Sequence, residues 1–138
     1  MKLSKDVVGN IGLFYVCYQL CLRGWNVMPT TRNARGIDVL VYSQDNSQKL
    51  SVQVKTLSHH PAVPLGQHLD NLFADFIVVC CNVATSTPEC FLLTPAEVRR
   101  LAGRSGKEGR VSYWLERRDY EQEKFRANWD RMGDPGMA

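Results

Sequence analysis

One stretch of the sequence, residues 36–56, constrains the fold more than any other. It reads GIDVLVYSQDNSQKLSVQVKT, two runs of alternating apolar residues around a polar centre. Alternation of this kind is typical of half-buried β-strands, and Asp45-Asn46 are residues that suit a turn. The pattern therefore predicts a β-hairpin with one face turned toward a core.

Polar side chains gather on the other face of this hairpin. A turn centred on Asp45-Asn46 places Asp38 directly across from Gln53, and opposed residues point to the same face. Lys55 lies two positions beyond Gln53 and shares that face. Such a trio suits phosphodiester hydrolysis, with Asp38 and Gln53 holding a divalent metal and Lys55 stabilising charge. An exposed strand face with an incidental Asp–Lys pair fits the periodicity equally well.

Residues 5–23 predict a helix that ends at Gly24. Apolar residues fall on two of its sides. One stripe contains Val7, Ile11, Phe14, Tyr15, Tyr18 and Leu22, and the other contains Leu13, Val16 and Leu20. A helix that is apolar on two sides is either enclosed by the fold or used in an interface. We expect the second stripe to pack inside the domain, with a homodimer through Leu13, Val16 and Leu20 as the alternative.

The remaining segments predict strands mixed with short helices. Residues 76–81 form a continuous apolar run, typical of a buried central strand, and residues 90–93 predict another strand. Thr94-Pro95-Ala96-Glu97 is typical of a helix start with a capping box. Residues 111–115 predict an edge strand, and the segment from 118 onward a terminal helix. We therefore expect one α/β domain over residues 1–132, with a mixed sheet, and a flexible tail over 133–138.

Composition narrows the class of protein without naming a function. The chain has 138 residues, 44% hydrophobic and 22% charged, as is ordinary for a globular domain, and its net charge of +3 is compatible with nucleic acid as a partner. Its five cysteines show neither a metal-binding pair nor a disulfide framework. No run has the length of a signal peptide core or a membrane span. The expectation is a cytoplasmic protein with free thiols and no membrane partner.

The order of these motifs resembles the PD-(D/E)xK nuclease superfamily. The residues that carry the resemblance are Gly36-Ile37-Asp38, Gln53-Val54-Lys55, Gly9-Asn10-Ile11-Gly12 and the run LCLRGWNV at 20–27. The pattern is most similar to the Q-x-K branch, seen in Mrr-type restriction endonucleases and related to Holliday-junction resolvases. The resemblance covers roughly residues 7–57. It implies a restriction-endonuclease-like α/β fold, a mixed β-sheet flanked by helices.

The resemblance also implies roles for the hairpin trio. Asp38 would be the metal-binding acid, Gln53 the metal-shell position and Lys55 the catalytic lysine. The implied activity is that of a DNA endonuclease that hydrolyses phosphodiester bonds with Mg²⁺ or Mn²⁺.

Two positions depart from the family pattern. Leu13 stands where members commonly have a glutamate in the first helix, and Gln53 occupies a position that is most often Glu. Magnesium can bind through one carboxylate together with substrate phosphates, so we expect the metal to bind weakly without DNA. The alternative is a nuclease-fold protein without catalysis, serving as a DNA- or protein-binding or inhibitory module.

Basic and aromatic residues outside the hairpin supply further candidates for nucleic-acid contact. Arg32 and Arg35 precede the Asp38 strand and suit phosphate contacts, and His59 and His60 follow the Lys55 strand closely. For all four, a solvated loop residue is the competing interpretation. The aromatic residues between 113 and 129 either stack unpaired bases or seal the core, and we favour the core.

Overall fold

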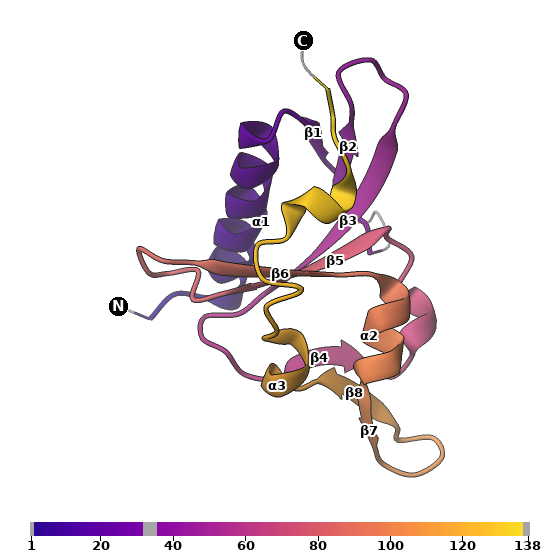
Figure 1. Ribbon diagram of the computed structural model, residues 1–138. Helices are drawn as coiled ribbons and strands as arrows, with labels where there is room; N and C mark the ends of the chain where they lie inside the picture. Colours follow the sequence, from indigo (N-terminus) through magenta and orange to yellow (C-terminus); the bar gives the residue numbers. More distant parts are fainter. Residues whose placement is uncertain (1, 32–35, 137–138) are drawn as a thin grey trace.

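The computed structural model describes residues 2–31 and 36–136 of the chain (Figure 1). Its elements, in chain order, are α1 (Lys5–Leu22), β1 (Asn26–Pro29), β2 (Val39–Tyr42), β3 (Lys49–Thr56), β4 (Val63–Gly66), the 3-10 helix η1 (Leu69–Asn71), β5 (Phe76–Cys81), β6 (Glu89–Leu93), α2 (Pro95–Leu101), β7 (Gly103–Ser105), β8 (Ser112–Leu115), α3 (Arg117–Tyr120) and the 3-10 helix η2 (Trp129–Met132).

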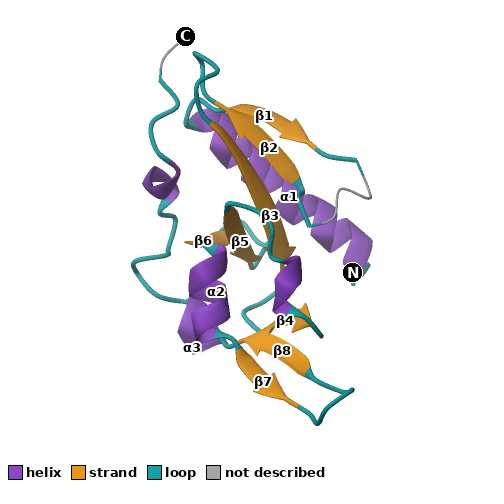
Figure 2. Cartoon of the chain, turned by 90° about the vertical axis from the view of Figure 1, so that its right-hand side faces the viewer, coloured by secondary structure: helices purple, strands orange, loops and turns teal. Residues whose placement is uncertain are grey.

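The main sheet has five strands in the order β1-β2-β3-β5-β6. All neighbouring strands are antiparallel except β3 and β5, which run parallel. A parallel pair needs a long crossover, and here it spans residues 57–75 and includes β4 and η1. The mixed sheet, with α1 on one face and shorter helices on the other side (Figure 2), confirms the predicted fold class.

The β2–β3 hairpin adopts the predicted register. Val39 pairs with Val52, and Tyr42 pairs with Lys49. The turn is held by the carboxylate of Asp45, which accepts hydrogen bonds from the hydroxyl and the backbone N–H of Ser47. These bonds favour the charged form and lower the pKa of Asp45 to about 2. Local turn chemistry therefore fixes which residues of β2 and β3 face each other.

Helix α1 packs along one face of the main sheet. Ser4 caps its N-terminus by accepting a hydrogen bond from the N–H of Val7. Val16 and Leu20 are fully buried in a first core cluster with valines of β2, β3 and β5, and Leu13 is half-buried against it. The prediction of internal packing for this stripe is confirmed. A homodimer through Leu13, Val16 and Leu20 is therefore wrong, because Val16 and Leu20 are fully buried against the sheet and only Leu13 is partly exposed.

A second core cluster lies on the opposite face of the sheet. A three-stranded sheet, β4-β8-β7, packs there, so the predicted edge strand at 111–115 is in fact the central strand of this small sheet. Tyr120 and Phe125 are fully buried in this cluster, and the ring of Tyr120 meets Phe91 edge-on at 5.5 Å. These aromatic rings seal the core, as favoured above, and are not available to stack on bases.

The C-terminal segment is tied to the body of the protein. Instead of a terminal helix, α3 ends at Tyr120 and the chain continues irregularly to η2, whose Trp129 and Met132 enter the first cluster. Pro135 is buried, and its carbonyl accepts a hydrogen bond of 2.8 Å from the N–H of Gln44. Within the predicted tail, Pro135 thus contacts the hairpin while Gly133, Asp134 and Gly136 are exposed; residues 137–138 lie outside the described residues, and flexibility of residues 133–138 stays a prediction.

The described helices were compared with what a membrane-spanning helix requires. Across residues 2–31 and 36–136, none is both long enough and apolar enough to cross a bilayer.

Helix α1 approaches the sheet closely at Gly12. A Cβ at this position would lie 2.1 Å from Oγ1 of Thr56, whereas a Cβ at Gly9, one turn earlier, would have nothing within 4 Å. We expect Gly12→Ala to lower the free energy of unfolding by about 1–3 kcal/mol, as overpacking does. Gly9→Ala should instead be neutral or raise it by about 0.5–1 kcal/mol, because alanine is the better helix former. Urea unfolding followed by circular dichroism measures both, and equal effects would contradict the close contact.

Candidate active site

Asp38 is anchored at the point where the chain enters β2. Its backbone N–H donates to the carbonyl of Val52, and its carbonyl accepts from the N–H of Thr30, both at 2.9 Å. The N–H of Val54 donates to Oδ2 of the Asp38 carboxylate at 2.7 Å. The side chain thus takes the place of a ladder carbonyl and points at the β3 backbone. The regular register ends at Val39, so Asp38 and Gln53 are neighbours without forming a ladder pair.

Gln53 carries an unsatisfied carbonyl oxygen. Its Oε1 is buried, and within the described residues it has no hydrogen-bond partner. The amide lies beside Gly36, whose left-handed backbone with φ of +81° favours glycine; a Cβ there would lie 3.1 Å from the carbonyl of Asn71 and in ordinary contact, 3.6 Å, with Nε2 of Gln53. A buried acceptor without a partner costs about 1–3 kcal/mol. Such an atom is a sign of a binding site, because a ligand can supply the missing partner.

Lys55 lies two residues farther along β3 and faces the second core cluster. It pairs with Val79 of β5, as Gln53 pairs with Ile77, and both partners belong to that cluster. Burial lowers the pKa of the Lys55 ammonium, and the carboxylate of Asp38 partly opposes this shift. Asp38 is thus the charge that compensates Lys55. The structure brings the predicted trio together, on the side of the sheet away from α1.

The oxygen donors of this trio fit a hard divalent cation. Oδ1 of Asp38 and Oε1 of Gln53 are oxygen ligands of the type that Mg²⁺ and Mn²⁺ accept. Within residues 2–31 and 36–136, Asp38 belongs to no group of three or more histidine, cysteine or carboxylate side chains. Leu13 packs against the first core cluster and offers no oxygen donor at this point of α1. The donor set fits a weakly held cation that needs further oxygens from a substrate.

The four residues predicted to contact nucleic acid lie in different surroundings. Arg32 and Arg35 lie outside the described residues. His59 is exposed in the loop after β3. The side chain of His60 is only 12% exposed, and its Nε2 lies 2.5 Å from Oε2 of Glu89. Phosphate contact therefore remains a prediction for His59, while His60 is already engaged by a carboxylate.

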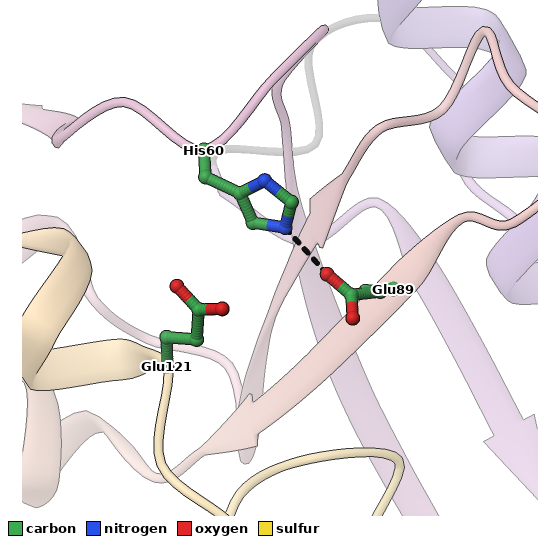
Figure 3. A group of neighbouring side chains, drawn as sticks. All are labelled: His60, Glu89 and Glu121. Atoms are coloured by element: carbon green, nitrogen blue, oxygen red, sulfur yellow. Dashed lines mark hydrogen bonds and ion pairs between the residues drawn. The ribbon is translucent and has the colours of Figure 1, made fainter.

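Sequence reasoning missed a polar cluster formed by His60, Glu89 and Glu121 (Figure 3), whose ligand atoms lie within 4.8 Å of one another. These residues come from the loop after β3, the start of β6 and the end of α3, so no local spacing signalled their convergence. Arg126 donates to Oε1 of Glu89 at 2.6 Å and lies 3.7 Å from Glu121, which also pairs with Arg117. Both carboxylates are already paired to guanidinium groups, so the cluster joins three segments of the chain through ion pairs.

An open apolar groove adjoins the trio on the same side of the sheet. Its lining includes Met28, Ile37, Leu40, Tyr42 and Ser51. Met28 and Leu40 are exposed, and Figure 2 shows α1 behind β1 and β2, on the other face. Leu40 and Ser51 lie two residues from Asp38 and Gln53 respectively, about 7 Å along each strand. The alternation of β2 already placed Leu40 and Tyr42 on this face, but only the fold shows that nothing in the described chain covers it.

The burial of Lys55 predicts a pH-dependent effect on stability. Because the folded pKa lies below the ordinary value of 10.5, the unfolded chain binds more protons between these two values, and wild-type stability rises with pH there. We therefore expect Lys55→Met to be more stable than wild type at neutral pH, with the advantage shrinking as pH approaches 10.5. Urea unfolding at several pH values measures the difference. Lys107→Met, at an exposed position between β7 and β8, is the control, and a pH-independent effect of Lys55→Met would contradict the assignment.

Comparison with known proteins yields structural matches only. No protein-family model and no curated protein matches this sequence. The structure of Hjc, a Holliday junction resolvase of Archaeoglobus fulgidus, matches with a TM-score of 0.53 and 10% identity over 78% of this chain and 90% of its own. A bacterial homing endonuclease matches with a TM-score of 0.61 and 15% identity over 94% of this chain and 93% of its own. At such low identity the likeness concerns the fold alone: the chain has a restriction-endonuclease-like fold.

Proposed function

We propose that this protein is a metal-dependent DNA endonuclease that hydrolyses phosphodiester bonds. The single observation that carries the proposal is the buried Oε1 of Gln53, which has no partner among residues 2–31 and 36–136, on the same side of the sheet as the half-buried Lys55 ammonium that the Asp38 carboxylate compensates. The resemblance of the motif order to PD-(D/E)xK nucleases and the nuclease-like fold support the same activity.

Each residue of the trio has a distinct task in this proposal. Asp38, held rigid by the N–H of Val54, and Gln53 bind a Mg²⁺ or Mn²⁺ ion. When bound there, the cation supplies Lewis-acid activation of the scissile phosphate. In this proposal Lys55 stabilises negative charge on the phosphate or orients the attacking water. Its lowered pKa reflects an ammonium with little hydration, whose field is stronger than that of a surface lysine.

A second function, DNA or protein binding without cleavage, is favoured by one specific observation. Leu13 replaces the expected glutamate with a side chain that packs against the apolar first cluster. A single carboxylate then has to hold the cation. Wild-type protein that is folded and binds DNA in a gel-shift assay, yet never cleaves it with Mg²⁺ or Mn²⁺, would replace the first function by this one.

Cleavage assays on supercoiled plasmid and branched DNA test the leading function. With Mg²⁺ or Mn²⁺ present, we expect Asp38→Ala and Lys55→Ala to lose at least about 10²-fold in rate, the size of effect that removal of one charge-stabilising group has. Lys107→Ala, which removes the same charge far from the trio, should cleave like wild type. Cleavage that persists in both site variants would show that another part of the chain performs the chemistry.

The metal site has a test that does not depend on cleavage. Gln53→Glu adds a carboxylate at a buried position, and a full charge about 4 Å from a cation is worth several kcal/mol near a protein surface. We expect this variant to bind Mn²⁺ at least about tenfold more tightly than wild type without DNA. Titration calorimetry measures the affinity, with the exposed Gln67→Glu as the control. Equal affinities of Gln53→Glu and wild type would place the cation elsewhere.

A further inference from the structure

Basic residues are concentrated in one short segment, residues 99–110, which covers the end of α2, β7 and the turn that leads into β8. This segment, which we call the basic arm, contains five basic side chains and one acidic side chain, a net charge of +4. The whole chain carries +3, so the rest of the sequence has a net charge of −1. The charged residues of the basic arm are Arg99, Arg100, Arg104, Lys107, Glu108 and Arg110.

Three arginines of the basic arm are exposed and unpaired. Arg100, Arg104 and Arg110 are exposed, and none of them takes part in an ion pair among residues 2–31 and 36–136. Three arginines elsewhere instead contact glutamates: Arg117, Arg126 and Arg131. Cations gathered in one segment repel one another, and an anionic ligand relieves this repulsion.

The turn between β7 and β8 holds two of these arginines on one projection. Arg104 lies in β7, opposite Tyr113 of β8. A Cβ at Gly106 would lie only 2.0 Å from the carbonyl oxygen of Arg110, and the N–H of Arg110 donates to the carbonyl of Lys107 at 2.8 Å. Figure 1 shows this hairpin projecting from the end of the molecule opposite the β2–β3 turn.

The basic arm belongs to the side of the sheet that carries the trio. Helix α2 and strand β8 each bury a side chain in the second core cluster, which Lys55 faces. Within the sheet, Gln53 pairs with Ile77 and Ile77 with Leu93, so the end of β6 lies two strand spacings, about 10 Å, from Gln53. Helix α2 starts two residues later and is about 10 Å long. The two lengths together are shorter than one helical turn of DNA, about 34 Å.

A direct contact also links the start of the basic arm to the surroundings of Gln53. The Nη2 of Arg99 donates to the carbonyl of Leu72 at 3.2 Å. The preceding residue, Asn71, has its carbonyl beside Gly36, which in turn borders the amide of Gln53. The basic arm is therefore anchored to the loop that adjoins the candidate active site.

We propose that the basic arm binds the phosphates of double-stranded DNA through Arg100, Arg104 and Arg110 and holds the substrate across the trio. The inference rests on the proposed function in taking DNA as the anion. A guanidinium group binds two phosphate oxygens at once, which the ammonium of a lysine cannot do. The tip residues Lys107 and Glu108 add no net charge, so the three arginines supply the contacts.

The composition of the basic arm favours a DNA backbone over other anionic partners. The segment contains no aromatic residue, and its one large apolar residue, Leu101, is half-buried against the second core cluster. An element that lies on a membrane needs apolar side chains to bury in the lipid. Single-stranded nucleic acid is held by aromatic rings that stack on its bases. Because the basic arm offers cations alone, it fits the phosphates of a duplex.

Fluorescence anisotropy with a labelled DNA duplex in EDTA, over a range of salt concentrations, tests the proposal. The chelator removes divalent metal, so binding is measured without cleavage. We expect the triple variant Arg100→Ala/Arg104→Ala/Arg110→Ala to reduce the slope of log affinity against log salt concentration by about 2.7, because each phosphate contact contributes about 0.9. Its affinity at low salt should fall at least about tenfold.

The matched control is Lys2→Ala/Lys5→Ala/Lys124→Ala, which removes the same net charge from exposed positions outside the basic arm. It should keep the wild-type slope, and circular dichroism verifies that each variant is folded. Equal slopes of the arginine variant and wild type would overturn the proposal. An equal loss in the control would also overturn it, because net charge alone would then govern binding. The same holds for a wild type that binds phosphatidylserine vesicles but not DNA.

The inference and the nuclease activity fail in different ways. If the arginine variant loses affinity while wild type never cleaves DNA, the basic arm is a DNA-binding surface and the nuclease activity is contradicted. If wild type cleaves DNA and the arginine variant binds and cleaves equally well, the nuclease activity stands and the role of the basic arm is overturned.

Discussion

The register of β2 against β3 is the constraint on which the rest of the structure depends. Because side chains alternate along a strand, a slip of one residue would move every core residue of these strands to the wrong face. The observed register, Val39 with Val52, sets Val39, Val41 and Val52 under α1 and leaves Gln53 and Lys55 on the other side. The turn at Asp45 fixes this register locally, and the contact of Gly12 with Thr56 fixes α1 against the end of the same strand.

The candidate active site contains features that oppose folding. The carbonyl of Gln53 is buried without a partner in the described chain, and the ammonium of Lys55 is partly desolvated. Neither arrangement is favourable in an unliganded protein. They persist because β3 is the central strand of the sheet and its neighbours hold both side chains in place. Unfavourable groups kept by a rigid scaffold are what a binding site for a cation and an anionic substrate requires.

Two other features of the structure lie outside the trio. The His60–Glu89–Glu121 cluster, with Arg126, joins the β3 loop to β6 and the end of α3 through partly buried ion pairs. The sequence of α1 contains no Asp, Glu, Lys or Arg between Val7 and Leu22, and its outward side leaves Phe14 and Tyr18 exposed. The first feature stabilises the fold that carries the trio. The second is an exposed apolar surface on the side of the sheet away from the trio.

Much of this arrangement follows from the sequence alone. Alternation and turn chemistry determined the hairpin, its register and the shared neighbourhood of Asp38, Gln53 and Lys55, because these depend on residues close in the chain. Helical periodicity identified both stripes of α1 and led to the expectation that the second packs inside the domain, but it did not show that most of the first stays exposed. Tertiary structure decided that Leu13, Val16 and Leu20 face inward, that Pro135 is held by the hairpin, and that His60 reaches Glu89. These outcomes depend on contacts between segments far apart in sequence, for which periodicity carries no information.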